Sequence, residues 1–368
     1  MIYLDNGATS FHKPPQVHQA VITAMRRCAN PGRGGYPAAM YAAGCVLQCR
    51  ERAGRLFGCD PEQVVFTGNC TQGLNIAIRT LVKPGSRVLI SGFEHNAVTR
   101  PLKALGAKIT VAGRKLFDWD DTLASFQKAL EDGVDVAVFT CVSNVFGYIL
   151  PVSELASLCR KYQVPFILDA AQGAGYLPLN LKDLGAAFIA MPGHKGLLGP
   201  QGTGLLLCGM LPQPLLYGGT GSVSALQEMP DFLPDRAEAG TLNVPGIAGL
   251  SEGIAYILRE GEENILRREQ AQVKRLCRGL EKIGVKCFWG EHQAGTISFL
   301  PDRDCEDVAE LLARQGIAVR AGLHCAPFAH ESAGTLQTGT VRVSYGLDAC
   351  DAQTKKLLSE LKKALFEA

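Results

Sequence analysis

The chain has 368 residues, and 37 Lys and Arg against 35 Asp and Glu leave a formal net charge of +2. This balance argues against a nucleic-acid-binding surface, and no apolar run approaches the roughly 18 residues that a membrane span needs. Apolar residues make up 47% of the chain and charged residues 20%, which predicts a large buried core. The first residues do not form a basic-then-apolar leader, so we expect a cytoplasmic protein.

The chain contains thirteen cysteines, an odd number, and none of them form a C-x-x-C pair. This usage argues against a disulfide framework and against a four-ligand zinc or iron–sulfur site, so no metal is expected. Most of these cysteines are expected to be small buried apolar residues, with one exception considered below.

Short apolar runs alternate with segments of helical period along the first part of the chain. Strands are expected at 64–66, 87–91, 108–112, 134–142, 165–169, 187–191 and 203–208. Helices are expected at 39–57, 71–82, 121–131 and 152–162. Several of the strand runs are apolar throughout, which is typical of a parallel sheet covered on both faces.

The pattern changes after residue 209. Residues 210–243 are rich in Gly, Pro and Ser and are expected to form loops, followed by helices at 246–259 and 262–282. Residues 285–368 indicate the order strand–strand–helix–strand–strand–helix. The predicted fold class is therefore α/β, with a large, mainly parallel sheet flanked by helices and a small C-terminal α+β domain.

Polar side chains follow several of the predicted strands, and ligands bind beyond the carboxyl ends of the strands in an open parallel sheet. Residues 68–73 turn from a strand into a helix, where backbone amides and the Thr71 hydroxyl would bind a phosphate, although such turns are often purely structural. His95, Asn144 and Asp169 follow other strands, and Gln172 lies three residues after Asp169. A carboxylate that ends a buried strand needs a partner, either a helix N-terminus or a cationic ligand nitrogen.

Lys195 stands between glycines in Gly193-His194-Lys195-Gly196, directly after a buried strand. A desolvated lysine is a typical Schiff-base former, because burial lowers the pKa of its amine. A phosphate-binding turn, an aspartate and a lysine at strand ends together suggest pyridoxal 5'-phosphate (PLP), whose ring nitrogen the aspartate would keep protonated.

At this point the chain resembles the class V aminotransferase group of fold-type I PLP enzymes, in the branch of cysteine desulfurases and selenocysteine lyases. The resemblance runs in register from residue 3 to residue 342. It is carried by Tyr3-Leu-Asp-Asn-Gly-Ala-Thr, residues 68–75, Glu94-His95, Val142-Ser-Asn144, Leu168-Asp-Ala-Ala-Gln172, Gly193-His-Lys195, Glu238-Ala-Gly-Thr241-Leu-Asn243, Arg320-Ala-Gly-Leu-His-Cys325-Ala and Val341-Arg342.

The resemblance implies a role for each matching residue in holding the cofactor. Lys195 would bond to the cofactor and move the substrate Cα proton, and His95 would stack on the ring and assist proton transfer. Asp169 would pair with the ring nitrogen, and Gln172 would bind the ring hydroxyl. The phosphate would be held by Cys70, Thr71 and His194, with Thr241 contributed by a partner subunit.

The resemblance also implies the residues that handle the substrate. Asn144 and Arg342 would bind its carboxylate, with Asn144 also near the cofactor, and Arg320 would lie near the substrate and the cysteine loop. Cys325 would take sulfur from the substrate as a persulfide, and a nearby His324 and Arg320 would favour its thiolate.

Some positions depart from the family pattern. Cys70 replaces the first of two hydroxyl residues, Gln72 stands where Glu is common, and Pro192 stands where a serine commonly binds phosphate. Leu323 replaces the first of two histidines before the cysteine, and residues 325–340 differ from the best-known members. These departures leave the substrate and the sulfur acceptor open.

The leading hypothesis is a cysteine desulfurase that converts L-cysteine to L-alanine and passes sulfur to an acceptor protein. A selenocysteine lyase acting on L-selenocysteine, another PLP-dependent β-elimination and an aminotransferase are alternatives, although Cys325 argues against transamination, which needs no thiol. A non-catalytic binding protein on the same fold is a distant alternative, which loss of Lys195, Asp169 or Arg342 would have supported.

The resemblance further implies the domain organisation and a homodimer. The large PLP-binding domain is expected at 15–258, and the small domain at 259–368 together with the N-terminal segment 1–14. Arg33, Gly34 and Gly35 lie in a loop that either reaches the partner's site or is an ordinary loop.

Overall fold

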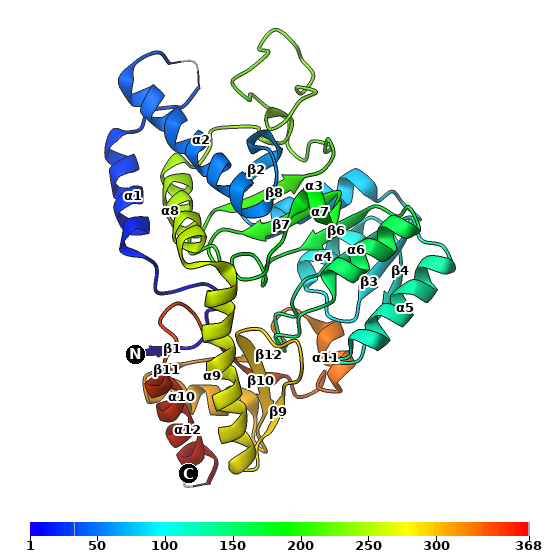
Figure 1. The fold of residues 1–368 in the computed structure, drawn as a ribbon, viewed down its shortest axis with the longest axis vertical. Helices are drawn as coiled ribbons and strands as arrows, with labels where there is room; N and C mark the ends of the chain where they lie inside the picture. Colours follow the sequence, from blue (N-terminus) through cyan, green and yellow to red (C-terminus); the bar gives the residue numbers. More distant parts are fainter. Residues whose placement is uncertain (33, 367–368) are drawn as a thin grey trace.

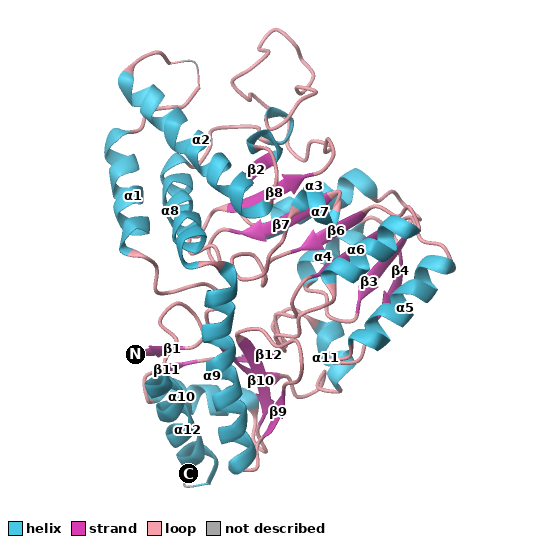
Figure 2. Cartoon of the chain, viewed as in Figure 1, coloured by secondary structure: helices cyan, strands magenta, loops and turns pink. Residues whose placement is uncertain are grey.

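The computed structural model describes residues 1–32 and 34–366, so the expectation for Arg33 lies outside the described residues. Its larger lobe is built on a seven-stranded sheet with the order β2-β8-β7-β6-β5-β3-β4 (Figure 2). Only β8 runs antiparallel to its neighbours in this sheet, and the other pairings are parallel. The strands are β2 (Val64–Thr67), β3 (Arg87–Ser91), β4 (Lys108–Ala112), β5 (Val136–Thr140), β6 (Phe166–Asp169), β7 (Phe188–Pro192) and β8 (Gly204–Cys208).

Alternate residues of these strands enter two separate cores, one on each face of the sheet. Leu89, Phe139 and Leu168 pack into the larger core, whereas their neighbours Ile90 and Val138 pack into the other one. Both faces are therefore covered, as the apolar runs predicted. The helices of this lobe are α1 (Pro15–Arg27), α2 (Pro37–Phe57), α3 (Cys70–Leu81), α4 (Asn96–Ala104), α5 (Trp119–Glu131), α6 (Val152–Lys161), α7 (Leu181–Leu184) and α8 (Val244–Glu260).

The predicted loop region between β8 and α8 is confirmed, with one short 3-10 helix at Asp235–Ala237. Helices α1, α4 and α7 were not predicted. α4 is only nine residues long and has Pro101 inside it, so its sequence carries a weak helical signal. No helix within the described range is both long and apolar enough to cross a membrane.

The smaller lobe begins with α9 (Glu262–Lys282) and contains a four-stranded antiparallel sheet of order β12-β13-β10-β9. The predicted order for this lobe lacks one strand and one helix, because β11, β12 and α11 follow α10 and the pair β13 and α12 comes after them. The helix α11 has seven residues, too few for a periodic pattern, and it starts at a proline shortly after Cys325. The elements are β9 (Lys286–Phe288), β10 (Thr296–Leu300), α10 (Cys305–Arg314), β11 (Ile317–Ala318), β12 (Arg320–Gly322), α11 (Pro327–Ala333), β13 (Thr340–Ser344) and α12 (Asp351–Phe366).

The N-terminus joins this smaller lobe. The strand β1 (Ile2–Tyr3) pairs in parallel with β11, and Asp5 bridges to Ser344 at the end of β13 (Figure 1). Leu4 is accordingly buried in the core of the smaller lobe. This pairing brings the N-terminal segment next to residues more than 300 positions away in the sequence.

Candidate active site

A cleft lies at the carboxyl ends of the parallel strands, where an open α/β sheet is expected to bind its ligand. It encloses about 530 Å³. Eight of the predicted site residues line it: Cys70, Thr71, His95, Asn144, Asp169, Gln172, His194 and Lys195.

Lys195 follows β7 in a turn in which Gly193 N donates to Thr203 O at 2.8 Å. Burial, followed by the positive charge of Arg342, lowers the pKa of its amine. Nζ has no hydrogen-bond partner among the described residues. A larger fraction of this amine is therefore neutral near pH 7 than for a surface lysine, and the neutral amine is the nucleophilic form.

Asp169 ends β6 and its side chain is buried. Its Oδ1 accepts hydrogen bonds from Ala171 N at 2.9 Å and from the Cys70 thiol at 3.5 Å. Burial, followed by the charge of Asp169, raises the pKa of Cys70 well above its usual value, so the thiol stays protonated and donates. Oδ2 has no hydrogen-bond partner in the described part of the chain, and it can accept from a cationic ligand nitrogen.

The N-terminus of α3 opens into the same cleft. Asn69 caps this helix by accepting from Gln72 N at 2.9 Å, and the Gln72 side chain accepts from Gly68 N at 2.7 Å. Gln72 therefore closes the turn with its side-chain carbonyl oxygen. The first-turn amides at Cys70 and Thr71 point out of the helix, and such amides bind anions.

His95 is the N-cap of α4, and its Nδ1 accepts from Ala97 N at 3.0 Å. The proton of the neutral ring is therefore on Nε2. Burial is the main cause that lowers the pKa of His95, so the ring is neutral at pH 7. It lines the cleft as a neutral aromatic donor.

Two predicted cofactor-binding residues contact the N-terminal segment. His194 Nδ1 lies 3.0 Å from Thr9 Oγ1, and burial lowers the pKa of His194 to about 4. Gln172 Nε2 donates to Gly7 O at 2.9 Å, which leaves its carbonyl oxygen as the group able to accept from a ligand hydroxyl. The segment from Gly7 to Thr9 thus fixes the orientation of both side chains.

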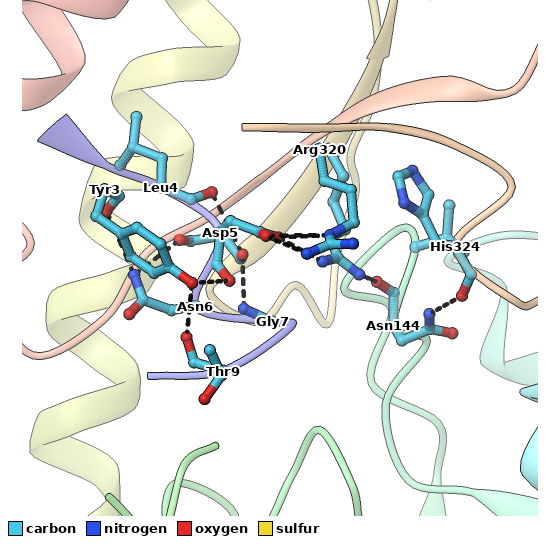
Figure 3. A network of polar contacts seen from close by, with 12 residues as sticks. Tyr3, Leu4, Asp5, Asn6, Gly7, Thr9, Asn144, Arg320 and His324 are labelled. Atoms are coloured by element: carbon cyan, nitrogen blue, oxygen red, sulfur yellow. Dashed lines mark hydrogen bonds and ion pairs between the residues drawn. The ribbon is translucent and has the colours of Figure 1, made fainter. Parts of the chain in front are cut away.

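Asp5 accepts hydrogen bonds from both arginines that were predicted to lie near the substrate, and Figure 3 shows Arg320 beside it. Arg342 Nη2 donates to Asp5 Oδ1 at 2.8 Å, and Arg320 Nη2 donates to Asp5 Oδ2 at 2.7 Å. Arg342 is buried, whereas the Arg320 side chain is 51% exposed. Sequence reasoning quoted Asp5 only as part of a motif and did not identify it as a site residue.

Arg342 and Asn144 each keep one polar atom free. Arg342 Nη1 donates to Asn144 O at 3.0 Å, and Asn144 Nδ2 donates to His324 O at 2.8 Å. Arg342 Nε and Asn144 Oδ1 are buried without a hydrogen-bond partner in the described residues. An unsatisfied buried polar atom costs about 1–3 kcal/mol, which a bound ligand can recover.

Cys325 lies between β12 and α11 and is exposed, unlike eight of the other twelve cysteines, which are buried. His324 and Cys325 have φ angles of 49° and 57°, so two consecutive non-glycine residues adopt the left-handed conformation. Cys325 O accepts from Asn96 N at 2.7 Å, next to His95. This bond anchors the cysteine loop at the edge of the cleft.

His324 does not supply the positive charge that was expected beside Cys325. Burial, followed by the charge of Arg342, lowers the pKa of His324 to about 2, so its ring is neutral. Arg320 is the remaining candidate for a positive charge beside Cys325. The Arg320 guanidinium group and the Cys325 side chain interact electrostatically.

Thr241 lies outside this cleft. It lines two neighbouring hollows beside the loop that precedes α8. Glu238 anchors this loop by accepting from Arg50 Nη2 at 2.5 Å and from Phe66 N at 2.6 Å. Thr241 shares one of these hollows with Gly68 and Gln72 of the predicted phosphate-binding turn, but it does not line the cleft with Cys70 and Thr71. Its role in a partner's site stays a prediction.

The groups in the cleft fit PLP. The α3 N-terminus offers amides for a phosphate, Asp169 keeps one carboxylate oxygen free for a ring nitrogen, and Lys195 offers a desolvated amine. The unpartnered Asn144 Oδ1 can accept from a ring hydroxyl. One cleft thus contains an anion site, an acceptor for a protonated nitrogen and an amine that can attack an aldehyde.

Comparison with solved structures supports this interpretation. The apo structure of a cysteine desulfurase from Thermococcus onnurineus NA1 superposes with a TM-score of 0.92 and 31% identity, covering 100% of this chain and 95% of that one. The cysteine desulfurase CsdA from Escherichia coli superposes with a TM-score of 0.85 and 25% identity, covering 99% of this chain and 94% of that one. The predicted fold of fold-type I PLP enzymes is therefore confirmed.

Sequence comparison agrees. A probable cysteine desulfurase from Methanothermobacter thermautotrophicus is 32% identical over 365 residues, which cover 93% of this chain and 89% of that protein. The profile of the aminotransferase class-V family matches residues 2–357. The chain belongs to the class V aminotransferase family, whose members are PLP-dependent enzymes.

Proposed function

We propose that the protein is a PLP-dependent cysteine desulfurase, which converts L-cysteine to L-alanine and leaves the sulfur on Cys325. The observation that carries this proposal is an exposed cysteine anchored at the edge of a cleft that contains Lys195 and Asp169. An aminotransferase needs no thiol at this position. The names of the similar proteins support the same reaction.

The substrate carboxylate has a defined donor in this proposal. Arg342 Nε is buried and has no partner among the described residues, and the Asp5 contact orients the rest of the guanidinium group. A carboxylate that accepts from Nε would satisfy this donor with a charge-assisted hydrogen bond. We assign Arg342 to the substrate carboxylate. Asn144 was predicted to share this role, but its Nδ2 donates to His324 O, so we assign its free Oδ1 to the cofactor hydroxyl, which Gln172 was predicted to bind.

The cofactor would be held by residues from four strand ends. The Cys70 and Thr71 amides with His194 would bind its phosphate, and Asp169 would bind its ring nitrogen, as the cleft geometry allows. When bound, PLP withdraws electrons from the substrate Cα and so makes the Cα proton acidic. Lys195, with its lowered pKa, is the base that would take this proton and return it.

The sulfur step uses Cys325. Its thiolate attacks the sulfur of L-cysteine, so an S–S bond forms to Cys325 while the substrate C–S bond breaks. The Cβ receives a proton, and the products are L-alanine and a persulfide on Cys325, so no outside oxidant or reductant is consumed. This step needs an accessible thiol, which the exposure of Cys325 provides.

We propose a homodimer as the functional assembly. Large apolar side chains are exposed on α1, at the start of and along α2, and in the loop before α8, and exposed apolar side chains are enriched at interfaces. Thr241 lies in that same loop, which suits its assignment to the partner's phosphate site. The exposed residues are Met25, Tyr36, Met40, Leu47, Leu216, Tyr217 and Leu226.

We also propose the domain boundaries 15–258 and 259–368, with segment 1–14 in the small domain. The pairing of β1 with β11 and the burial of Leu4 among residues of the smaller lobe support the assignment of the N-terminal segment. The Cys325 loop bridges the two domains, since Ala326 and Ala329 pack into the core of the larger lobe.

The test is the alanine formed from L-cysteine and, separately, from L-selenocysteine by protein loaded with PLP and supplied with a reductant. Alanine from cysteine should disappear in Cys325→Ala and persist in Cys350→Ala, a matched change at the other exposed cysteine. Alanine from selenocysteine that survives Cys325→Ala, with little from cysteine, would indicate a selenocysteine lyase instead. Absence of alanine from both substrates would refute the proposal.

A further inference from the structure

A groove continues from the catalytic cleft to the molecular surface between α3 and α4. It encloses about 750 Å³, and Thr71 and His95 line both the cleft and this groove. Cys325 also lines this groove. The other lining residues are Asn75 and Arg79 from α3, and Asn96, Ala97, Arg100, Pro101 and Ala104 from α4.

The helix geometry orders these residues along the groove. Thr71, Asn75 and Arg79 are four residues apart and lie on one face of α3, so Arg79 is about 12 Å further along the axis than Thr71. On α4, Arg100 is about 6 Å beyond Asn96, whose amide holds the Cys325 carbonyl. The groove thus runs from Cys325 past Arg100 and then past Arg79.

The charge of this groove is uncompensated. Arg79 and Arg100 are both exposed, and neither has a carboxylate within ion-pair distance in the described part of the chain. No Asp or Glu lines the groove. Two unpaired guanidinium groups in a concave surface produce a local positive potential, which attracts anionic partners.

We propose that this groove receives the sulfur acceptor, and that the acceptor is a protein segment with a cysteine followed or preceded by carboxylates. An extended segment advances about 3.3 Å per residue, so the carboxylates would lie about two and four residues from the acceptor cysteine. This proposal rests on the desulfurase function, because it concerns the persulfide that Cys325 forms.

The transfer is a thiol–persulfide exchange. The acceptor thiolate attacks the outer sulfur of the Cys325 persulfide, the S–S bond to Cys325 breaks, and the Cys325 thiolate leaves. The acceptor becomes the persulfide, the transferred sulfur keeps its proton, and Cys325 is left as a thiolate. Atoms and electrons balance without an added reductant.

The experiment starts from the PLP-loaded protein after one turnover with L-cysteine, with the persulfide on Cys325 measured by mass spectrometry. Two peptides are compared: one with a single cysteine and Asp two and four residues away on both sides, and a twin with Asn at those positions. At low salt the Asp peptide should take up sulfur about tenfold faster than the twin. At 0.5 M salt the difference should shrink, because salt screens exposed charges.

Matched variants assign this preference to the groove. The double variant Arg79→Gln with Arg100→Gln should lose the preference for the Asp peptide while still forming alanine in the first turnover. The control variant Arg267→Gln with Arg278→Gln removes the same charge from the exposed face of α9 and should keep the preference.

Three results would overturn the groove proposal. The first is an equal rate of sulfur uptake by the two peptides, and the second is an equal loss of preference in both double variants. The third is a weakened dimer in Arg79→Gln with Arg100→Gln, which would assign the groove to a second copy of the chain. Absence of a persulfide on Cys325 before any peptide is added would refute the desulfurase function itself.

Discussion

Replacing Asp5 by alanine should destabilise the fold far more than replacing its exposed partner Arg320. Asp5 accepts from the buried Arg342 at 2.8 Å and from the half-exposed Arg320 at 2.7 Å. Removing the carboxylate leaves Arg342 as an uncompensated buried charge, which costs about 3–5 kcal/mol. Arg320→Ala leaves the Asp5–Arg342 pair intact and should cost about 1 kcal/mol or less, since solvent screens an exposed pair.

The assay is urea unfolding of the PLP-free protein, followed by circular dichroism at fixed protein concentration. Asp5→Ala should lower the unfolding midpoint strongly, and Arg320→Ala should leave it nearly unchanged, with similar slopes for all three proteins. Asp5→Ala should also raise KM for cysteine, because Arg342 loses its fixed orientation. Similar midpoint shifts for the two variants would refute the assignment of Asp5 to the buried arginine.

Three further outcomes follow from the described contacts. Lys195→Ala should bind PLP without a covalent bond that borohydride reduction can trap, and should form no alanine; trapping in the variant would exclude Lys195 as the Schiff-base residue. Cys70→Ala should release PLP about fivefold faster than Cys70→Ser, because only serine keeps a hydrogen-bond donor for Asp169 and such a bond is worth about 1 kcal/mol. Equal release rates would contradict a role for this hydrogen bond in holding PLP. Burial raises the pKa of Glu269 to about 8, so the stability that its neutral form contributes is present below pH 4.5 and is lost as pH rises toward 8. Glu269→Gln should therefore unfold at a higher urea concentration than wild type at pH 8 but not at pH 4. A difference in unfolding midpoint that does not change with pH would contradict the raised pKa of Glu269.

The sheet could be predicted from the sequence because its signal is local. The expected β3 and β4 agree with the structure at both ends, and the other strands of the large sheet agree within one or two residues. Each strand is a short apolar run between turns, and both faces of the sheet are covered. Neighbouring residues alone therefore indicate where each strand begins and ends. The short helices α4 and α11 were missed because they contain too few residues for a helical period.

The polar contacts of the site were less predictable. The family resemblance indicated Arg342 and Arg320, but Asp5, which holds both, lies more than 300 residues away from them in the sequence. The neutral state of His324 likewise depends on burial by residues distant in the chain. Such contacts depend on the packing of the two lobes, which no local pattern describes.

The pairing of β1 with β11 has a consequence for the order in which the protein matures. Residues 68–73, Asp169 and Lys195 are synthesised well before β13, whereas Arg342 on β13 pairs with Asp5, which directly follows β1. During synthesis, the N-terminal segment must therefore wait for nearly the whole chain before its partner strand exists. A nascent chain can complete the cleft around Lys195 early, but Arg342 gains its buried carboxylate partner only when the segment around Asp5 meets β13.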